Sequence, residues 1–290
     1  MFEKGRILKE FCTLKVGGPA KYFFTAYTKD DLIMATEEAR RLNIPVFLLG
    51  KGSNCLFDDR GFQGLVILNK WSECSIEGVK ATASAGYSFA YLGIKTAKAG
   101  LGGLEFASGI PGSVGGAVYM NAGANGQEVS HVIESCEIIN STGHLQNLTK
   151  DDLVFGYRYS SLQKERAIIC SATFSLSSDP LAQKTQQKIL DYRLKTQPYG
   201  EKSAGCIFQN PEGASAGQWI DALGLKGLSV GDAEVSELHG NFIINKGSAR
   251  AQDIHTLIEE IQKRIEAHYG KRLEMEVKCV PYTPRVHVSG

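Results

Sequence analysis

Glycine is concentrated in one stretch of this chain, and that stretch limits what the chain can fold into. The 290 residues include 32 glycines, about 11% where roughly 7% is usual. Nine of them lie between Gly100 and Gly126. Each glycine loses more backbone entropy on folding than any other residue, so such a run is costly unless backbone must pass close to something. We interpret the stretch as backbone that lies against a flat ligand and its phosphates; tight crossings between strands are the alternative.

The overall composition excludes several classes of protein. Lys and Arg total 32 and Asp and Glu 31, so no excess charge favours nucleic acid or an anionic membrane as partner. Hydrophobic residues reach 43%, which predicts a sizeable core and excludes a disordered chain. No apolar export signal follows Met1, and no window reaches the roughly 20 apolar residues of a membrane span. We therefore expect a protein without membrane or nucleic-acid partners.

The seven cysteines indicate a reducing compartment. They are odd in number, scattered, and never spaced as CxxC, so they predict neither a disulfide framework nor a zinc site. The six histidines show no metal-ligand spacing either, and we expect no metal. A cytoplasmic location follows as the expectation.

Hydrophobic periodicity predicts strands and helices that alternate, without an internal repeat. Thr28 and Ser88 precede apolar residues at helical spacing and predict helix starts. The predicted helices end near residues 42, 99, 196, 223 and 268. Strands are predicted over residues 22–25, 46–49, 65–68, 79–85, 132–139, 167–176, 241–244 and 273–279.

A second glycine-rich segment, loop 50–54, follows the predicted strand 46–49. Its backbone N–H groups can converge on an anion because no Cβ blocks the approach. It matches neither the GxGxxG pattern of a Rossmann site nor the GxxxxGK[ST] pattern of a P-loop. A tight β-turn is the alternative interpretation.

Two further positions carry side chains suited to catalysis or ligand binding. Arg158 lies between two tyrosines and offers a cation for a carboxylate or phosphate, although a surface arginine at a strand edge reads the same way. Cys206 lies in a glycine turn; a thiol with a reference pKa of about 8.5 is mostly protonated at pH 7 and can give a proton. A small buried hydrophobe is the alternative there.

The strand predicted over residues 273–279 alternates polar and apolar residues. Glu274 and Glu276 point to one side, whereas Leu273, Met275 and Val277 point to the other. The default interpretation of the carboxylate pair is a solvated face.

These clusters, in this order, resemble one family, the UDP-N-acetylenolpyruvoylglucosamine reductases. The resemblance covers residues 14 to about 280 and fits the shorter type of the family. It is carried by residues 14–20, 50–54, 109–117, 121–123, 156–160, 203–211, 222–227, 239–245 and 273–277.

The resemblance implies an α+β fold, with a two-part FAD-binding domain of the vanillyl-alcohol-oxidase/PCMH type and a C-terminal α+β substrate-binding domain. Its implied boundaries are residues 1–66, joined by 278–290, then 67–195, then 196–277. It also implies which residues contact FAD: Gly50, Lys51, Gly52, Ser53, Asn54, Gly109, Ile110, Pro111, Gly112, Ser113, Gly115, Gly116, Ala117, Asn121, Ala122 and Gly123.

The implied activity is a step of peptidoglycan precursor synthesis. NADPH reduces FAD, and flavin N5 passes a hydride to the enolpyruvyl ether of UDP-N-acetylglucosamine enolpyruvate, which gives UDP-N-acetylmuramate. Arg158, Cys206 and Glu276 match the catalytic positions, with Cys206 as proton donor and Glu276 expected to be neutral or hydrogen-bonded. Tyr157, Arg193 and Asn210 match positions that contact the UDP-sugar. No obligatory protein partner is implied.

Three positions depart from the family pattern. Cys206 stands where serine is usual, which suggests sensitivity to oxidation. Gln209 replaces a lysine near the substrate phosphates, and Asp232 replaces a glycine in a turn.

Two other functions remain open at this point. A flavin oxidase that acts on another small alcohol or sugar shares the implied fold, but residues 273–277 argue against it because oxidases have a different cap domain. A nucleotide-sugar sensor without turnover is the second, and the presence of Arg158 and Glu276 argues against that.

Overall fold

The computed structural model describes residues 2–165 and 167–283. Its contacts divide the chain into two compact units. Unit 1 comprises Met1–Phe23, Gly52–Val66 and Leu194–Gly290, and unit 2 comprises Phe24–Lys51 and Ile67–Arg193. The chain therefore passes from one unit to the other four times. Of the predicted C-terminal segment 278–290, residues 284–290 lie outside the described residues.

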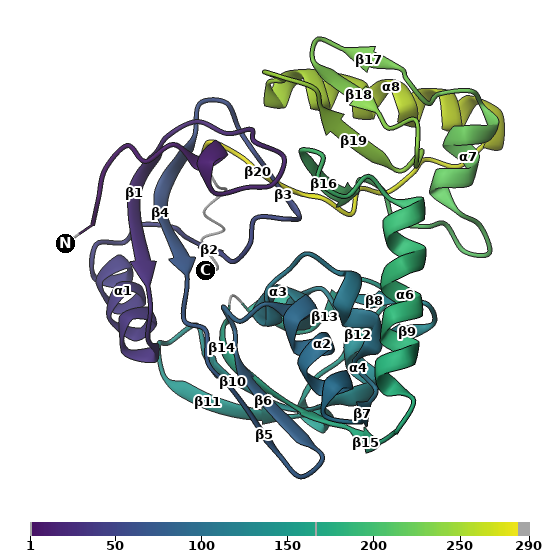
Figure 1. Ribbon diagram of the computed structural model, residues 1–290. Coiled ribbons are helices and arrows are strands. Elements are labelled where there is room, and N and C mark those ends of the chain that lie inside the picture. The colour runs from purple at the N-terminus through teal and green to yellow at the C-terminus, as the bar shows by residue number, and fades with distance from the viewer. Residues whose placement is uncertain (1, 166, 284–290) are drawn as a thin grey trace. The chain divides into compact units, whose positions relative to one another are not determined.

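A five-stranded antiparallel sheet is the centre of unit 2. Its strand order is β11-β10-β14-β6-β5, and helices α2 (Phe89–Lys98) and α3 (Val114–Tyr119) lie on one face of it (Figure 1). Phe89, Phe106 and Phe174 meet in the core beneath these helices, with ring centroids 5.9 and 6.5 Å from that of Phe89. The strands are β5 (Cys74–Glu77), β6 (Lys80–Ser84), β10 (Ile133–Ile139), β11 (Leu145–Thr149) and β14 (Ile168–Ser175).

The predicted helix starts of unit 2 are confirmed. The Thr28 side chain accepts a hydrogen bond from the Asp31 amide at the start of α1 (Lys29–Arg41), and Ser88 caps α2 in the same way. The other elements of the unit are β2 (Val46–Leu49), β7 (Leu101–Gly102), η2 (Glu105–Gly109), β8 (Gly123–Ala124), β9 (Gln127–Glu128), α4 (Val129–Val132), η3 (Lys150–Asp152), β12 (Phe155–Gly156), β13 (Tyr159–Ser160), α5 (Leu162–Glu165), β15 (Ser177–Ser178) and α6 (Ala182–Thr196), whose residues from Leu194 on belong to unit 1.

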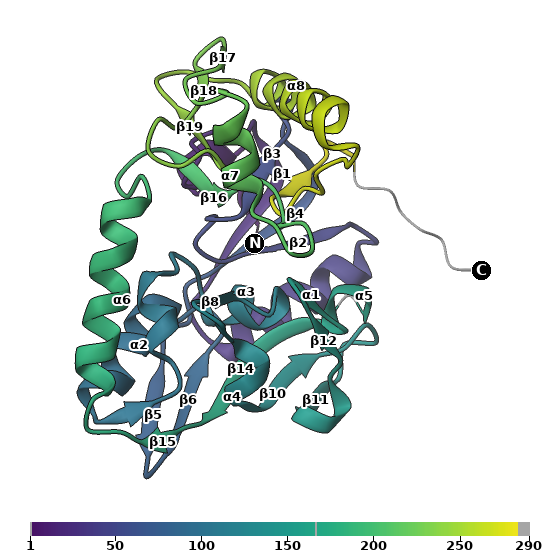
Figure 2. The same cartoon turned by 90° about the vertical axis from the view of Figure 1, so that its right-hand side faces the viewer.

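A smaller sheet of order β16-β19-β18-β17 organises unit 1. Helix α8 (Ala251–Tyr269) buries the predicted apolar stripe, Ile254 to Ile265, in the core of this unit and contacts β17 and β18 (Figure 2). The remaining elements here are η1 (Leu8–Glu10), β16 (Ser203–Cys206), α7 (Ala216–Ala222), β17 (Ser229–Val230), β18 (Ala233–Val235) and β19 (Phe242–Asn245).

Segments from the beginning of the chain join this core. Leu14 and Leu56 are buried among the residues of α8 and β19, and the Asp59 carboxylate accepts hydrogen bonds from the Ala251 and Gln252 amides at the start of α8, at 2.8 and 3.2 Å. Strand β3 (Cys55–Phe57) pairs in parallel with β20 (Lys278–Val280). A third sheet, β1-β4-β2, uses β1 (Ala20–Ala26) and β4 (Phe62–Asn69).

The strand predicted over residues 273–279 is partly wrong. Only its end belongs to β20; upstream, Met275 makes an isolated antiparallel bridge to Phe208, and Val277 lies in a bend. Leu273 and Val277 are buried as predicted, but Met275 is 41% exposed. The bend breaks the two-residue alternation that a continuous strand imposes.

No helix among the described residues is long and apolar enough to cross a membrane.

Candidate active site

In unit 2, the glycine-rich residues 109–117 form a turn and the short helix α3. The Ser113 hydroxyl accepts a hydrogen bond from the Gly116 amide at the start of α3. Gly115 packs on Ala85: its N–H donates to the Ala85 carbonyl at 2.9 Å, and a Cβ there would lie 2.8 Å from that of Ala85. Packing therefore explains this first glycine of the pair.

Gly116 is different because the protein itself does not require it. The residue is exposed, and the nearest atom to a Cβ built there is Ser113 Oγ at 3.5 Å, an ordinary contact. The missing side chain leaves the helix surface bare, which is what a flat ligand against backbone needs. Tight packing therefore does not explain this second glycine, and its contact with a ligand stays a prediction.

The buried side chain of Asn121 joins this turn to the segment that carries Arg158. Its Nδ2 donates to the Gly156 carbonyl, and its Oδ1 accepts from the Ser130 amide, both at 2.9 Å. Arg158 Nη2 donates to the Gly123 carbonyl at 3.2 Å. Two predicted groups, residues 121–123 and Arg158, are thus brought together.

Arg158 lies in the two-residue turn between β12 and β13, not in a strand edge. Its φ of 55° places it in the left-handed region, where a side-chain-bearing residue is strained and a functional constraint is a common reason. Its guanidinium carbon lies 5.0 Å from the ring centroid of Tyr157, which is 48% exposed. Arg193 is half-buried on α6 rather than on this turn.

Loop 50–54 contains a turn at Ser53 and Asn54, but it does not join two paired strands of a hairpin. The strands on either side of it belong to different sheets, because β2 pairs in the sheet with β4 whereas β3 pairs with β20. In unit 2, a Cβ at Gly50 would lie 3.0 Å from Ser113 Cβ and would overlap its hydroxyl. In unit 1, Gly52 has φ 64° and rests on the Cys12 backbone, 2.6 Å from a built Cβ, while its carbonyl accepts from the Thr13 amide at 3.1 Å.

In unit 1, Cys206 ends β16, an edge strand of the small sheet. A register shift against β19 falls between Ser203 and Cys206, at Gly205, whose φ is 74°. The bulge redirects the chain so that the Ser53 carbonyl lies 3.9 Å from the Cβ position of Gly205. Cys206 is half-buried.

The segment after Cys206 runs antiparallel to the segment that carries Glu276. The Ile207 carbonyl accepts from the Glu276 amide at 2.8 Å, and the Gln209 amide donates to the Glu274 carbonyl at 2.8 Å. Asn54 joins from loop 50–54: its Nδ2 donates to the Glu276 carbonyl at 3.3 Å, and its own carbonyl accepts from the Lys278 amide at 3.1 Å. Three predicted groups therefore meet within unit 1: the end of the loop, Cys206 and Glu276.

The side chain of Asn210 supports the start of a helix in unit 1. Its Oδ1 accepts from the Ala216 amide at 3.0 Å, at the first residue of α7. The helix thus uses the carbonyl oxygen of this side chain.

Two residues of this region received no role in the sequence analysis. Thr13 holds the Gly52 carbonyl with its amide and its hydroxyl, at 3.1 and 3.2 Å. Asn241 is 2% exposed and bonds to Phe208 through both ends of its amide. The available signal was an asparagine at the start of the predicted apolar strand 241–244, because a buried amide must find partners.

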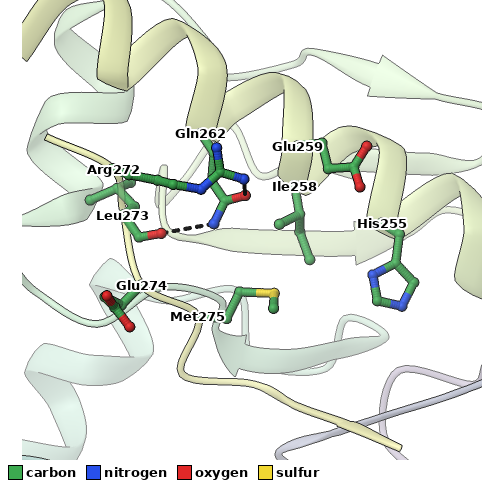
Figure 3. Close-up of a pocket in the computed structure, with 8 residues that line it drawn as sticks. All are labelled: His255, Ile258, Glu259, Gln262, Arg272, Leu273, Glu274 and Met275. Atoms are coloured by element: carbon green, nitrogen blue, oxygen red, sulfur yellow. Dashed lines mark hydrogen bonds between the residues drawn. The ribbon is translucent and has the colours of Figure 1, made fainter. Parts of the chain in front are cut away.

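A cavity of about 330 Å³ lies between helix α8 and the segment that precedes Glu276. Residues of α8 and of segment 272–275 line it: His255, Ile258, Glu259, Gln262, Arg272, Leu273, Glu274 and Met275. In Figure 3 the Met275 side chain points beneath Ile258, and Gln262 donates to the Leu273 carbonyl at 2.8 Å. The exposed Met275 therefore faces this cavity, and none of the predicted catalytic residues lines it.

Burial raises the pKa of Cys55, Cys136 and Cys170 to about 12. These thiols stay protonated and unreactive at neutral pH, because the thiolate is the nucleophile. Within the described part of the chain no group of three or more His, Cys, Asp or Glu side chains is placed to hold a metal ion.

Comparisons with known proteins fit this geometry. Residues 20–149 match the model of the FAD binding domain, and residues 197–280 match that of the UDP-N-acetylenolpyruvoylglucosamine reductase C-terminal domain. The chain is thus a flavin-binding protein of α+β fold, which confirms the predicted fold class.

Relatives of similar length narrow the class to one family. The UDP-N-acetylenolpyruvoylglucosamine reductase of Chlamydia pneumoniae is 46% identical over 97% of this chain and 92% of its own length, and that of Protochlamydia amoebophila is 48% identical over 97% and 94%. The crystal structure of the Thermus caldophilus reductase is 38% identical and superposes with a TM-score of 0.83, over 97% of this chain and all of that one. The chain belongs to the UDP-N-acetylenolpyruvoylglucosamine reductase family.

Proposed function

We propose that this chain is the FAD- and NADPH-dependent enzyme that reduces UDP-N-acetylglucosamine enolpyruvate to UDP-N-acetylmuramate for peptidoglycan synthesis. Family membership supports the reaction, and one observation in the chain supports the chemistry: the segments of Cys206 and Glu276 run side by side next to Asn54. An acid and a carboxylate are thereby held beside a glycine-rich loop.

The glycine-rich segments suit FAD. We assign residues 50–54 to its pyrophosphate, and residues 109–117 and 121–123 to the pyrophosphate and the ring system. The bare backbone at Gly116 supports this assignment. FAD held by these residues would supply the hydride-transfer chemistry between NADPH and the substrate.

Arg158 is assigned to the negative charge that develops on the substrate. Hydride addition to the terminal vinyl carbon leaves charge on the adjacent carbon and its carboxylate. A guanidinium fixed by the Gly123 carbonyl and by a strained turn is preorganised for such an anion. Tyr157, beside this guanidinium, and Arg193 and Asn210 are assigned to the UDP-sugar.

Cys206 is assigned as the proton donor. Its thiol gives a proton to the carbon next to the ether oxygen, which completes the lactyl ether, and the thiolate recovers a proton from solvent. We assign Glu276 to the same charge as Arg158, in a neutral or hydrogen-bonded form, because an ionised carboxylate would oppose it. The half-buried positions of both residues support these roles.

We further propose that residues 1–66 with 278–290, and residues 67–195, form the two parts of the FAD domain, and that 196–277 bind substrate. A cytoplasmic location fits the seven cysteines, none of which forms a disulfide.

The direct test uses Cys206→Ala and Cys206→Ser. NADPH should reduce the flavin of both variants at the wild-type rate, because that step needs no proton from residue 206. Product formation should fall at least about 100-fold in Cys206→Ala and should recover in Cys206→Ser. Cys74→Ala, which changes a half-buried thiol in β5, is the control.

Three outcomes would contradict the proposal. Full turnover by Cys206→Ala excludes this residue as proton donor. A wild-type protein that neither binds nor can be reconstituted with flavin excludes the enzyme. Reduced flavin that is reoxidised only by oxygen or another alcohol-derived substrate favours an oxidase, and reduced flavin that is never reoxidised favours a sensor.

A further inference from the structure

Asn241 continues the hydrogen bonding between two segments beyond the point where their strand pairing in the small sheet ends. Strands β16 and β19 pair as far as Cys206 and Phe242. Beyond this point the Asn241 carbonyl accepts from the Ile207 amide at 2.9 Å. Its side chain then takes both backbone groups of Phe208: Oδ1 accepts from the amide at 2.9 Å, and Nδ2 donates to the carbonyl at 2.8 Å.

The residues that Asn241 holds are the link between Cys206 and Glu276. On their other side, the Ile207 carbonyl accepts from the Glu276 amide at 2.8 Å, and Phe208 forms its bridge with Met275. Ile207 and Phe208 thus form a middle strand, with Asn241 on one side and the Glu276 segment on the other. A shift of this strand moves both Cys206 and Glu276.

The turn that carries Asn241 is itself supported. Its amide donates to His239 Nδ1 at 3.2 Å, and a Cβ at Gly240 would lie 2.7 Å from the Gly217 carbonyl of α7. Helix α7 therefore packs directly on the turn. With 2% of its surface exposed, the Asn241 amide is screened from competing water.

We propose that Asn241 is a positioning residue, which fixes the Cys206 thiol and the Glu276 carboxylate in the arrangement that proton delivery requires. A primary amide suits this place because it donates and accepts at once, as a strand residue does. This inference rests on the proposed roles of Cys206 and Glu276.

The first test is Asn241→Ala, with the two half-reactions measured separately and per bound flavin. Reduction of the flavin by NADPH should stay within about twofold of wild type. Oxidation by the enolpyruvyl substrate should slow about 100-fold, because a displacement of about 1 Å costs a factor of that size. A residue that only stabilised the fold would change flavin content and leave the ratio of the two rates unchanged.

Asn241→Asp gives a second readout in a side chain of the same shape. The carboxylate accepts from the Phe208 amide but cannot donate to its carbonyl, whereas the protonated acid can do both. Its oxidative half-reaction, relative to wild type, should therefore recover as the pH falls. The ionisable residues Cys206, His239, Glu274 and Glu276 are near this site in both proteins. The result is therefore read from the ratio of the variant's rate to the wild-type rate at each pH.

Asn140→Ala is the matched control. Asn140 lies in the turn between β10 and β11, where its Oδ1 accepts from the Thr142 and His144 amides at 3.1 and 3.0 Å. It should leave both half-reactions at wild-type rates.

The outcomes separate this inference from the proposed function. An oxidative half-reaction in Asn241→Ala within threefold of wild type overturns the inference, as does equal slowing of both half-reactions. If Asn241→Ala retains too little flavin, a ratio for Asn241→Asp that is flat with pH overturns it alone. If the wild-type protein does not convert the enolpyruvyl substrate, the proposed function fails and this inference with it.

Discussion

The two groups of predicted site residues are built in opposite ways. In unit 2, the predicted site residues of α3 and of the turn before it are mainly backbone. At Gly116 the exposed surface is backbone because the residue has no side chain. In unit 1, Cys206 and Glu276 contribute side chains, and strand pairing through Ile207 and Phe208 holds them. A bound cofactor needs a bare surface, whereas proton transfer needs groups at fixed separations.

The difference determines which substitutions each region tolerates. Where backbone forms the surface, the harmful substitution is one that adds a side-chain atom to a glycine. Its effect on stability depends on whether the neighbouring atoms can move away. In a side-chain arrangement the damaging change is a lost contact. Loop 50–54 contains both situations, since Gly50 faces a side chain and Gly52 faces backbone.

The largest effect is expected at Gly52. A Cβ there would overlap the Phe11 carbonyl and lie 2.6 Å from Cys12 Cα, on a backbone with φ 64°. Gly52→Ala should lower the free energy of unfolding by more than about 3 kcal/mol and remove bound flavin, because the neighbouring backbone can move only at a large cost in energy. Denaturant unfolding and flavin content measure this.

Two controls sharpen the comparison. Gly213→Ala has a similar φ of 71° but open space around its Cβ, so it should cost only the left-handed penalty of about 1–2 kcal/mol. Gly50→Ala meets a rotatable hydroxyl and should fall below Gly52→Ala. Equal losses for Gly52 and Gly213 would show that the close approach to Phe11 has no effect.

A smaller effect is expected from one ion pair in each unit, because the two pairs contribute to stability over different pH ranges. The Arg60 guanidinium bonds to Asp58 at 2.7 and 2.9 Å and lowers the pKa of that carboxyl to about 2. This contribution in unit 1 is present above the unfolded pKa of about 3.9 and is lost as the pH falls through about 2. In unit 2, the hydrogen bond to Glu137 raises the pKa of Lys29. Its contribution is complete below about pH 10.4 and is lost as the pH rises through the folded pKa.

Arg60→Gln and Lys29→Gln test this pair. Each should lower Tm at pH 7 by a few degrees at most, because partly exposed ion pairs contribute little. The deficit of Arg60→Gln should vanish near pH 2 and persist in strong alkali, where arginine stays charged, whereas that of Lys29→Gln should vanish in strong alkali. Identical pH profiles for the two variants would contradict the assignment.

The smallest effect on stability is expected at Gly116, where the substitution should stabilise the flavin-free protein and not destabilise it. Alanine fits there at 3.5 Å from Ser113 Oγ and is the better helix former by up to about 1 kcal/mol. Gly116→Ala should slightly raise the Tm of the flavin-free protein and weaken flavin binding at the same time. A raised Tm with unchanged flavin affinity would remove Gly116 from the cofactor surface.

Local signals predicted the elements well and the pairing of distant segments poorly. The caps at Thr28 and Ser88 and the stripe of α8 are properties of neighbouring residues, and all three are confirmed. The contact of the Cys206 and Glu276 segments joins residues 70 positions apart, and no periodicity encodes it. For the same reason Met275 was assigned to the core, since its environment depends on Phe208 and on the bend at Val277.

The roles of Asn121 and Asn241 were hidden for a related reason. Both are buried polar residues whose partners are backbone atoms. Backbone N–H and C=O groups are nearly the same in every residue, so the sequence does not indicate which of them a side chain will bond. Only the folded chain shows where such hydrogen bonds form.

The pairing of β3 with β20 has a consequence for synthesis of the protein. Strand β3 ends at Phe57, and its partner begins at Lys278, so more than 200 residues must be translated before the pair can form. At about 5–20 residues per second this delay is roughly ten to forty seconds. The last residue of unit 2 is Arg193, so this unit is fully synthesised before unit 1 is. During that interval the nascent chain exposes the edges of β3, and a chaperone that shields this segment should raise the yield of folded protein.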